Sequence, residues 1–302
     1  MNEKNYIALG GTLFVPSTHK NLENIICHEK YVNLKSVLVD TEDGLNEVEL
    51  SIGLKAIEKL LKVYKKKKLL VFIRPKNTNI LKKLLSMSGI EKIDGFILPK
   101  FSLTNAKEYL DILKPYDFGL MPSIEGKELF NQNELHELKD ILLTSKQNIV
   151  LVRFGLEDML RQLSMKRSCE ESLFDYAATA SVIGNFIAVF KSAGFVVSGG
   201  VYPCFKDEDG FIRDVKRDLK EGLFSKTIIH PNQIKIVNDL YKVSREEYDE
   251  AKKICESQNT VFNLNDKMAE KLTMEPYSNI ILIRAEIYGV ADKLIRYITV
   301  HS

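Results

Sequence analysis

The sequence predicts an α/β protein, a single (β/α)8 TIM barrel with a C-terminal helical extension. Short apolar runs recur roughly every 25 to 35 residues, and each is followed by a longer segment with helical spacing, which is the pattern of repeated βα units around a parallel sheet. The chain has 302 residues, and α/β barrels commonly use about 250 residues as one domain. No G-x-G-x-x-G follows the first run, which favours a closed barrel over an open doubly wound sheet.

Eight apolar runs are predicted to form the barrel strands. In chain order they are residues 12–15, 36–39, 69–73, 95–98, 118–121, 149–152, 195–197 and 226–229. Helical spacing between these runs predicts helices, among them residues 57–65, 78–87, 104–113, 134–143, 173–193 and 209–222.

The barrel is predicted to occupy residues 1–242, and residues 243–302 are predicted to form the extension, which serves as a lid or an oligomer contact. Ser244 and Glu247 have the spacing of a capping box and predict a helix start. Residues 263–271 are polar and are predicted to form a loop. Residues 277–297 are predicted to form a largely apolar helix that needs burial.

The composition points to a small-molecule partner. Forty-three basic and 41 acidic residues give a net charge of +2, which removes a general electrostatic case for nucleic acid or membrane binding. No run of about 18 uncharged apolar residues occurs and the N-terminus is polar, so a cytoplasmic protein is expected. Cys27, Cys169, Cys204 and Cys255 contain no C-x-x-C pair, so neither a disulfide framework nor a zinc site is expected.

Two carboxylates follow neighbouring predicted strands. Glu125 comes after the fifth strand and Asp158 after the sixth, and residues at the carboxyl ends of barrel strands line the active-site face. Two hard oxygen ligands suit Mg²⁺, whose remaining positions can receive a keto acid. The alternative is that both carboxylates cap helix N-termini at the surface.

Charged residues follow three other strands. Arg74 offers a planar, permanently charged fork for a substrate carboxylate, or alternatively forms a structural ion pair with the acidic cluster after the second strand. That cluster, Asp40, Glu42 and Asp43, can orient metal-bound water, or alternatively cap the following helix. Lys100 follows the fourth strand and is a second candidate for substrate binding.

The sequence motifs in these segments, and their order along the chain, resemble those of one family of lyases. The segments, within residues 12–290, are Leu13-Phe14-Val15-Pro16, residues 40–43, Ile73-Arg74, Leu98-Pro99-Lys100, Ile124-Glu125, residues 155–158 and the long stretch 210–238. Together they resemble the citrate lyase β-subunit-like and malyl-CoA lyase-like aldolase family. The resemblance implies a barrel fold and a homo-oligomer, a trimer or a hexamer.

The resemblance also implies a chemistry. It implies that Glu125 and Asp158 hold Mg²⁺ and that Arg74 binds the carboxylate of a keto-acid fragment. The family's mechanism has the metal polarise the oxygen of that fragment while a C–C bond breaks or forms. The implied substrate is a carboxylated small molecule, with a CoA thioester as a candidate. Hydrolysis of an acyl-CoA by the same site is an alternative.

One departure from the family concerns its acid/base residue. The family carries G-K-M-x-D in its C-terminal segment, and the aspartate often acts in the site of a neighbouring subunit. This chain has Asp266-Lys267-Met268-Ala269-Glu270, so Glu270 takes that place as the catalytic candidate, with a solvated helix residue as the alternative. The residues at positions 10–12 and 198–202 differ from those of the family's motifs. The chain is therefore similar to a divergent branch, the C–C bond lyases associated with tellurium-resistance gene clusters. A catalytically weak barrel that binds a metabolite or a partner protein is a further alternative.

Overall fold

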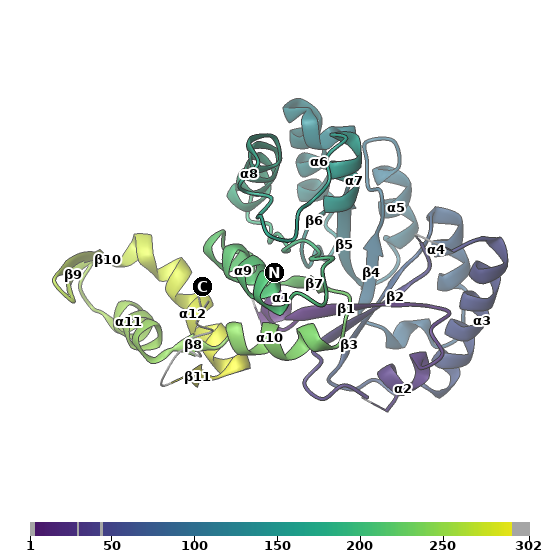
Figure 1. Cartoon of the computed structure of the whole chain (residues 1–302), viewed down its shortest axis with the longest axis horizontal. Coiled ribbons are helices and arrows are strands. Elements are labelled where there is room, and N and C mark those ends of the chain that lie inside the picture. The colour runs from purple at the N-terminus through teal and green to yellow at the C-terminus, as the bar shows by residue number, and fades with distance from the viewer. Residues whose placement is uncertain (1–3, 29, 43–44, 292–302) are drawn as a thin grey trace.

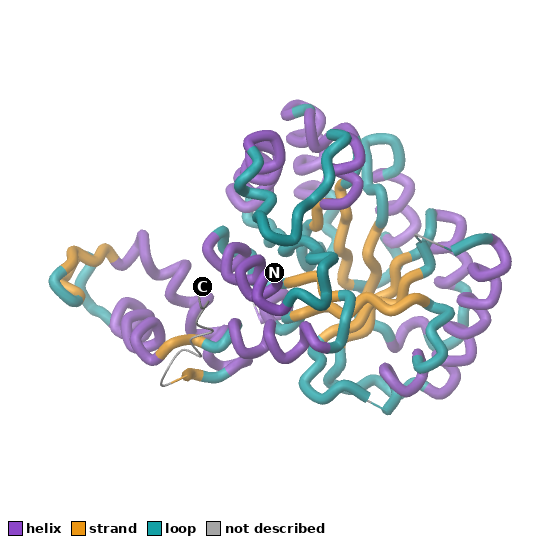
Figure 2. Tube along the Cα trace, in the orientation of Figure 1, coloured by secondary structure: helices purple, strands orange, loops and turns teal. Residues whose placement is uncertain are grey.

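The computed structural model describes residues 4–28, 30–42 and 45–291, and Figures 1 and 2 show a curled parallel sheet with helices around it. In this part of the chain the sheet has seven strands in the order β6-β5-β4-β3-β2-β1-β7, and all neighbouring pairs are parallel. The strands are β1 (Gly11–Pro16), β2 (Ser36–Asp40), β3 (Leu70–Arg74), β4 (Gly95–Leu98), β5 (Gly119–Ile124), β6 (Arg153–Phe154) and β7 (Lys226–Ile228). The predicted α/β barrel is confirmed.

The eighth strand position is formed by isolated bridges in place of a regular strand. Val197 bridges Val152 on one side, and Gly199 bridges Lys226 on the other, so this short segment lies between the β6 region and β7. A Cβ at Gly199 would lie 2.1 Å from Oδ2 of Asp218. Glycine permits this close approach, and the two glycines at positions 199 and 200 weaken the strand because they have no side chains to pack. The predicted strand 195–197 is therefore shorter and more irregular than the sequence pattern suggests.

Helices cover the outside of the sheet, as Figure 1 shows. They are α1 (Lys4–Ile7), α2 (Leu22–Ile26), α3 (Glu47–Val63), α4 (Thr78–Leu85), α5 (Ala106–Leu113), α6 (Gln132–Thr144), α7 (Leu156–Gln162), α8 (Ala177–Ser192), α9 (Glu208–Lys220) and α10 (Asn232–Leu240), with short 3-10 turns η1 (Ile90–Lys92) and η2 (Lys127–Phe130). Asn46 and Glu49 form a capping box at the start of α3. Every residue of β4 and β5 is buried, as expected for strands enclosed between the barrel interior and the helices.

The C-terminal segment extends away from the barrel in Figure 1. It contains β8 (Val243–Ser244), α11 (Arg245–Glu256), β9 (Val261–Leu264), β10 (Lys267–Glu270), α12 (Lys271–Tyr288) and β11 (Val290–Ala291). The predicted capping box of Ser244 and Glu247 is confirmed at α11. None of the helices in the described residues is long and apolar enough to cross a membrane.

Two expectations for this part of the chain were wrong in detail. The predicted loop 263–271 is mostly an antiparallel hairpin of β9 and β10. Its two-residue turn, Asn265-Asp266, has positive φ at both positions, a conformation that Asn and Asp tolerate. The apolar helix begins at Lys271, before the predicted start at residue 277, and the part of the prediction beyond residue 291 lies outside the described residues.

The cysteines also differ from expectation, because Cys169 and Cys204 form a disulfide. They are 35 residues apart in sequence, with Cα atoms 6.1 Å apart. Cys169 lies in the loop after α7 and Cys204 in the loop before α9. These loops follow adjacent strand positions of the barrel, so the fold brings together two cysteines that the sequence spacing does not connect.

Candidate active site

A cavity of about 210 Å³ opens at the carboxyl ends of the barrel strands. It is lined by polar and charged side chains from several strand ends together with apolar walls: Phe14, Arg74, Ile97, Ser123, Glu125, Arg153, Phe154, Gly155, Leu156, Glu157, Asp158, Gly200, Val201, Thr227 and Ile229. This face of a barrel is where active sites lie. Three of the predicted site residues, Arg74, Glu125 and Asp158, are thus brought together around one cavity.

Glu125 is the most buried carboxylate of this cavity. It follows the last residue of β5, and its side chain is only 5% exposed. Burial raises the pKa of Glu125 to about 7, helped by the carboxylates of Glu42 and Asp158 and opposed by a hydrogen bond from Ser123 and the charge of Arg74. Its Oε2 atom is buried and has no hydrogen-bond partner in the described residues. A buried carboxylate oxygen without a donor suits a cation.

The chain packs closely around Glu125 on the side of Asp158. Asp158 lies in the first turn of α7, where Arg161 Nη2 is 2.7 Å from its Oδ1. The Gln162 side-chain amide donates to the backbone carbonyl of Glu125 at 2.7 Å and to that of Asp158 at 3.2 Å. A Cβ at Gly155 would lie 2.2 Å from Cγ of Glu125, so only glycine fits against this side chain. The backbone thus fixes both residues at one wall of the cavity.

These two carboxylates match the modest ligand set that Mg²⁺ takes from proteins. Mg²⁺ commonly binds one or two carboxylates and fills its other positions with water and substrate oxygens. The described residues contain no group of three or more His, Cys, Asp or Glu side chains that could hold a metal. The predicted roles of Glu125 and Asp158 therefore fit the residues present, and they stay predictions.

Arg74 is held by two carboxylates of the predicted acidic cluster. Its Nε and Nη2 atoms each donate to Asp40 at 2.7 Å, and its Nη1 lies 2.8 Å from Glu42. Lys100 Nζ reaches the other oxygen of Glu42 at 2.8 Å. Asp40 and Glu42 thus orient Arg74 and Lys100, and Asn46 caps the following helix instead. The third member of the predicted cluster, Asp43, lies outside the described residues.

Sequence reasoning missed Arg153, which lines the same cavity. It is the first residue of β6 and its side chain points into the barrel, where Nη2 donates to the Thr227 hydroxyl of β7. Burial and the nearby charge of Arg74 lower the pKa of Arg153 to about 10. The available signal was an arginine directly after the apolar run 149–152, at the carboxyl end of a predicted barrel strand.

Glu270 is not part of this cavity within one chain. It is the last residue of β10, it precedes α12 without a side-chain cap bond, and its side chain is exposed. The hairpin that carries it lies in the segment that extends away from the barrel (Figure 1). The structure of a single chain therefore does not bring Glu270 to Glu125 and Asp158.

The sequence model of one protein family, described as C-C bond lyase of the TIM-barrel fold, matches residues 3–290. The chain belongs to this C–C bond lyase family. Among its curated relatives, citrate lyase subunit beta of Escherichia coli K12 is 25% identical over 156 residues, which are 49% of this chain and 50% of the relative. A (3S)-malyl-CoA thioesterase of Cereibacter sphaeroides is 24% identical over 159 residues, 52% of this chain and 51% of the relative. The chain spans about half the length of these curated relatives.

Solved structures show the same fold as this C–C bond lyase chain. The protein CitE from Mycobacterium tuberculosis, in complex with magnesium, acetoacetate and coenzyme A, has a TM-score of 0.68 and 18% identity, and the match covers 92% of this chain and 98% of CitE. RipC from Yersinia pestis has a TM-score of 0.60 and 17% identity, with 80% of this chain and 99% of RipC covered. At these identities the comparison establishes the architecture alone.

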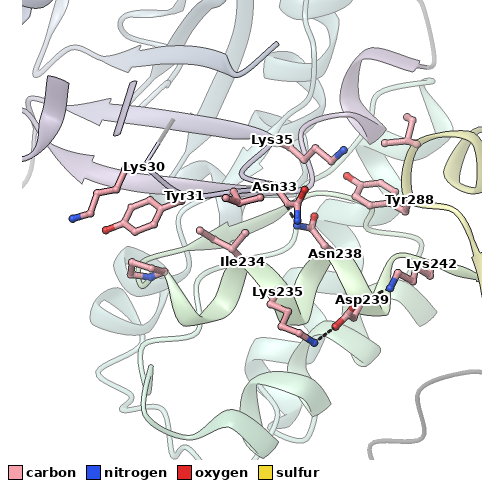
Figure 3. A pocket seen from close by; sticks show the side chains of 13 residues that line it. Lys30, Tyr31, Asn33, Lys35, Ile234, Lys235, Asn238, Asp239, Lys242 and Tyr288 are labelled. Carbon is pink, nitrogen blue, oxygen red and sulfur yellow. Dashed lines mark hydrogen bonds and ion pairs between the residues drawn. The ribbon is translucent and has the colours of Figure 1, made fainter. Parts of the chain in front are cut away.

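A larger cavity of the C–C bond lyase chain, about 610 Å³, lies outside the barrel (Figure 3). It is bordered by residues 30–35, by α10 and by the end of α12. Its lining combines lysines with apolar side chains such as Ile234. Asp239 pairs with both Lys235 and Lys242. None of the predicted site residues lines it, so its size alone does not make it the active site.

Proposed function

We propose that this chain is a Mg²⁺-dependent carbon–carbon lyase or aldolase that binds the keto-acid fragment of a carboxylated substrate. The observation that carries the proposal is the meeting of Glu125, Asp158 and Arg74 around one cavity at the carboxyl ends of the strands. The buried, unpartnered oxygen of Glu125 supports a cation there. Membership of the C–C bond lyase family supports the reaction class.

In this proposal Glu125 and Asp158 hold the metal, and Arg74 binds the carboxylate of the keto acid. Mg²⁺ at these two residues supplies electrostatic stabilisation of the negative charge that develops when the C–C bond breaks. Asp40 and Glu42 fix the Arg74 guanidinium, so that its orientation does not depend on substrate. Lys100, held by Glu42 with its side chain half exposed, does not line the cavity, and its contribution here is to hold Glu42 in place beside Arg74.

Coenzyme A is proposed as part of the substrate. CitE was solved with magnesium, acetoacetate and coenzyme A, and the relatives include a malyl-CoA thioesterase and a citramalyl-CoA lyase. The similarity to a thioesterase also makes hydrolysis of the thioester the second candidate function. Analysis of the products separates the two, because cleavage of a C–C bond releases a keto acid and hydrolysis releases the intact hydroxy acid.

We also propose a homo-oligomer, a trimer or a hexamer, in which the extension of one copy covers the cavity of another. In the described part of the extension, four apolar side chains are more than half exposed in the single chain: Val261, Met268, Leu272 and Tyr277. An exposed apolar surface of this kind is typical of a protein contact. Glu270 lies in the same segment, so this contact is the route by which it can reach a metal site as the acid/base residue.

Calorimetric titration tests the proposed function. Protein in Mg²⁺ is titrated with oxaloacetate, pyruvate and glyoxylate, and each titration is repeated with EDTA. We expect keto-acid binding that needs Mg²⁺ and is lost in Glu125→Ala, while the exposed control Glu91→Ala binds like the wild type. Binding that persists in EDTA contradicts the metal site, and no binding at all favours a catalytically weak barrel that serves as a binding protein.

A further inference from the structure

Arg153 is a deeply buried cation that forms no ion pair within 4 Å in the described residues, although the more distant charge of Glu125 acts to raise its pKa. Its side chain is 5% exposed. Nη2 donates to the Thr227 hydroxyl, and the guanidinium carbon lies 5.4 Å from the centre of the Phe14 ring. Nη1 is shielded from solvent and has no hydrogen-bond acceptor there. A buried guanidinium in this state is costly unless an anion joins it.

Three other buried or largely buried cations in the described residues have acidic partners. Lys226 pairs with two aspartates of α9, and Arg167 pairs with one of them. Arg74 has Asp40 and Glu42. Arg284 is buried without an ion pair in the described residues, but it donates to a backbone carbonyl of residue 241 and does not line the cavity. Arg153 therefore combines two properties: it has no ion pair in the described residues, and it lines a cavity that a ligand can enter.

The position of Arg153 relative to the metal residues indicates which part of a ligand it would meet. Arg153 pairs in register with Ser123, two residues before Glu125, so it lies one layer deeper in the barrel than the carboxylates. The guanidinium carbons of Arg74 and Arg153 are each 5.4 Å from the centre of the same Phe14 ring. Of these two neighbouring cations, Arg74 forms direct ion pairs with two carboxylates, and Arg153 forms none in the described residues.

We infer that Arg153 binds a second carboxylate of the keto-acid fragment, and that the site selects keto dicarboxylic acids over keto monocarboxylic acids. This inference rests on the proposed function, in which the metal and Arg74 hold the first carboxylate. A cavity of about 210 Å³ has room for a small dicarboxylate. Guanidinium matches a carboxylate in shape and charge, and the pair is strong where water is excluded.

Two keto acids that differ at one end test this inference. Oxaloacetate carries a second carboxylate, and 2-oxobutyrate has a methyl group in its place. By calorimetry in Mg²⁺ we expect the wild-type protein to bind oxaloacetate at least about tenfold more tightly, the effect of one charge-assisted pair. The variant Arg153→Gln is expected to lose this preference while its affinity for 2-oxobutyrate changes by less than about threefold. The exposed control Arg213→Gln is expected to keep the preference.

Three outcomes overturn the inference. A wild-type protein that binds both acids equally shows that the second carboxylate meets no cation, and this result needs no variant to fold. A folded Arg153→Gln protein that loses affinity for both acids to the same degree shows a structural role. Absence of Mg²⁺-dependent binding of either acid overturns the proposed function together with this inference, whereas the first two results leave the proposed function standing.

Discussion

Replacement of Glu125 by glutamine is expected to change how the metal-free protein responds to pH. The pKa of Glu125 is raised from 4.5 to about 7, mainly by burial. The native state therefore keeps a proton between about pH 4.5 and pH 7 that the unfolded chain has lost, and the free energy of unfolding falls as the pH rises through this window. A difference of about 2.5 pKa units corresponds to about 3 kcal/mol. Stability from this group is full below pH 4.5 and is lost above pH 7.

The assay is urea denaturation of metal-free protein between pH 5 and pH 8.5, followed by circular dichroism. Other groups titrate in the same range, so the informative quantity is the wild-type free energy of unfolding minus that of Glu125→Gln. We expect this difference to shift against the wild type by about 3 kcal/mol between pH 5 and pH 8.5, and Mg²⁺ to reverse part of the shift. A constant difference across the range would refute the reasoning that Glu125 is buried and uncompensated without a metal.

Three further substitutions probe the site. Glu42→Gln leaves two cations without their shared carboxylate, so we expect a loss of about 3 kcal/mol in urea denaturation; a change below about 0.5 kcal/mol would mean that the ion pairs contribute little. Gly155→Ala pushes a methyl group into Glu125, and calorimetry is expected to show about tenfold weaker Mg²⁺-dependent keto-acid binding, whereas unchanged affinity would place the metal elsewhere. Glu270→Gln is expected to reduce turnover at least about tenfold and to regain activity when mixed with Glu125→Ala protein; undiminished turnover would remove Glu270 from the mechanism.

The barrel could be predicted because most of its strands are buried apolar runs that alternate with segments of helical spacing. This local information places β1 to β5 within one or two residues of their predicted bounds, apart from longer carboxyl ends such as Ile124 in β5. The segment around Gly199 was harder, because its pairing depends on close packing against Asp218, which only the folded chain reveals. The turn at Asn265-Asp266 was a readable signal for the hairpin, but the polar composition around it suggested a loop.

The candidate site was predictable where a charged residue follows a strand, as with Glu125 and Arg74. Arg153 was missed because the strand position of an arginine does not tell whether the fold supplies it with a carboxylate. That property depends on side chains from distant strands, here Thr227 and Phe14. The Cys169–Cys204 disulfide was not predicted for the same reason, because its two loops are brought together by the folded barrel and not by their spacing in the sequence.

Binding of Mn²⁺ tests the central claim most directly, because Mn²⁺ replaces Mg²⁺ at oxygen sites and its free form gives a strong electron paramagnetic resonance signal. Titration of the protein with Mn²⁺ is expected to show one site per chain in the wild type and in Glu91→Ala. The site is expected to be lost, or weakened at least about tenfold, in Glu125→Gln and in Asp158→Asn. Mn²⁺ affinity that is unchanged in folded Glu125→Gln and Asp158→Asn proteins would contradict the account of this cavity as a metal-dependent lyase site.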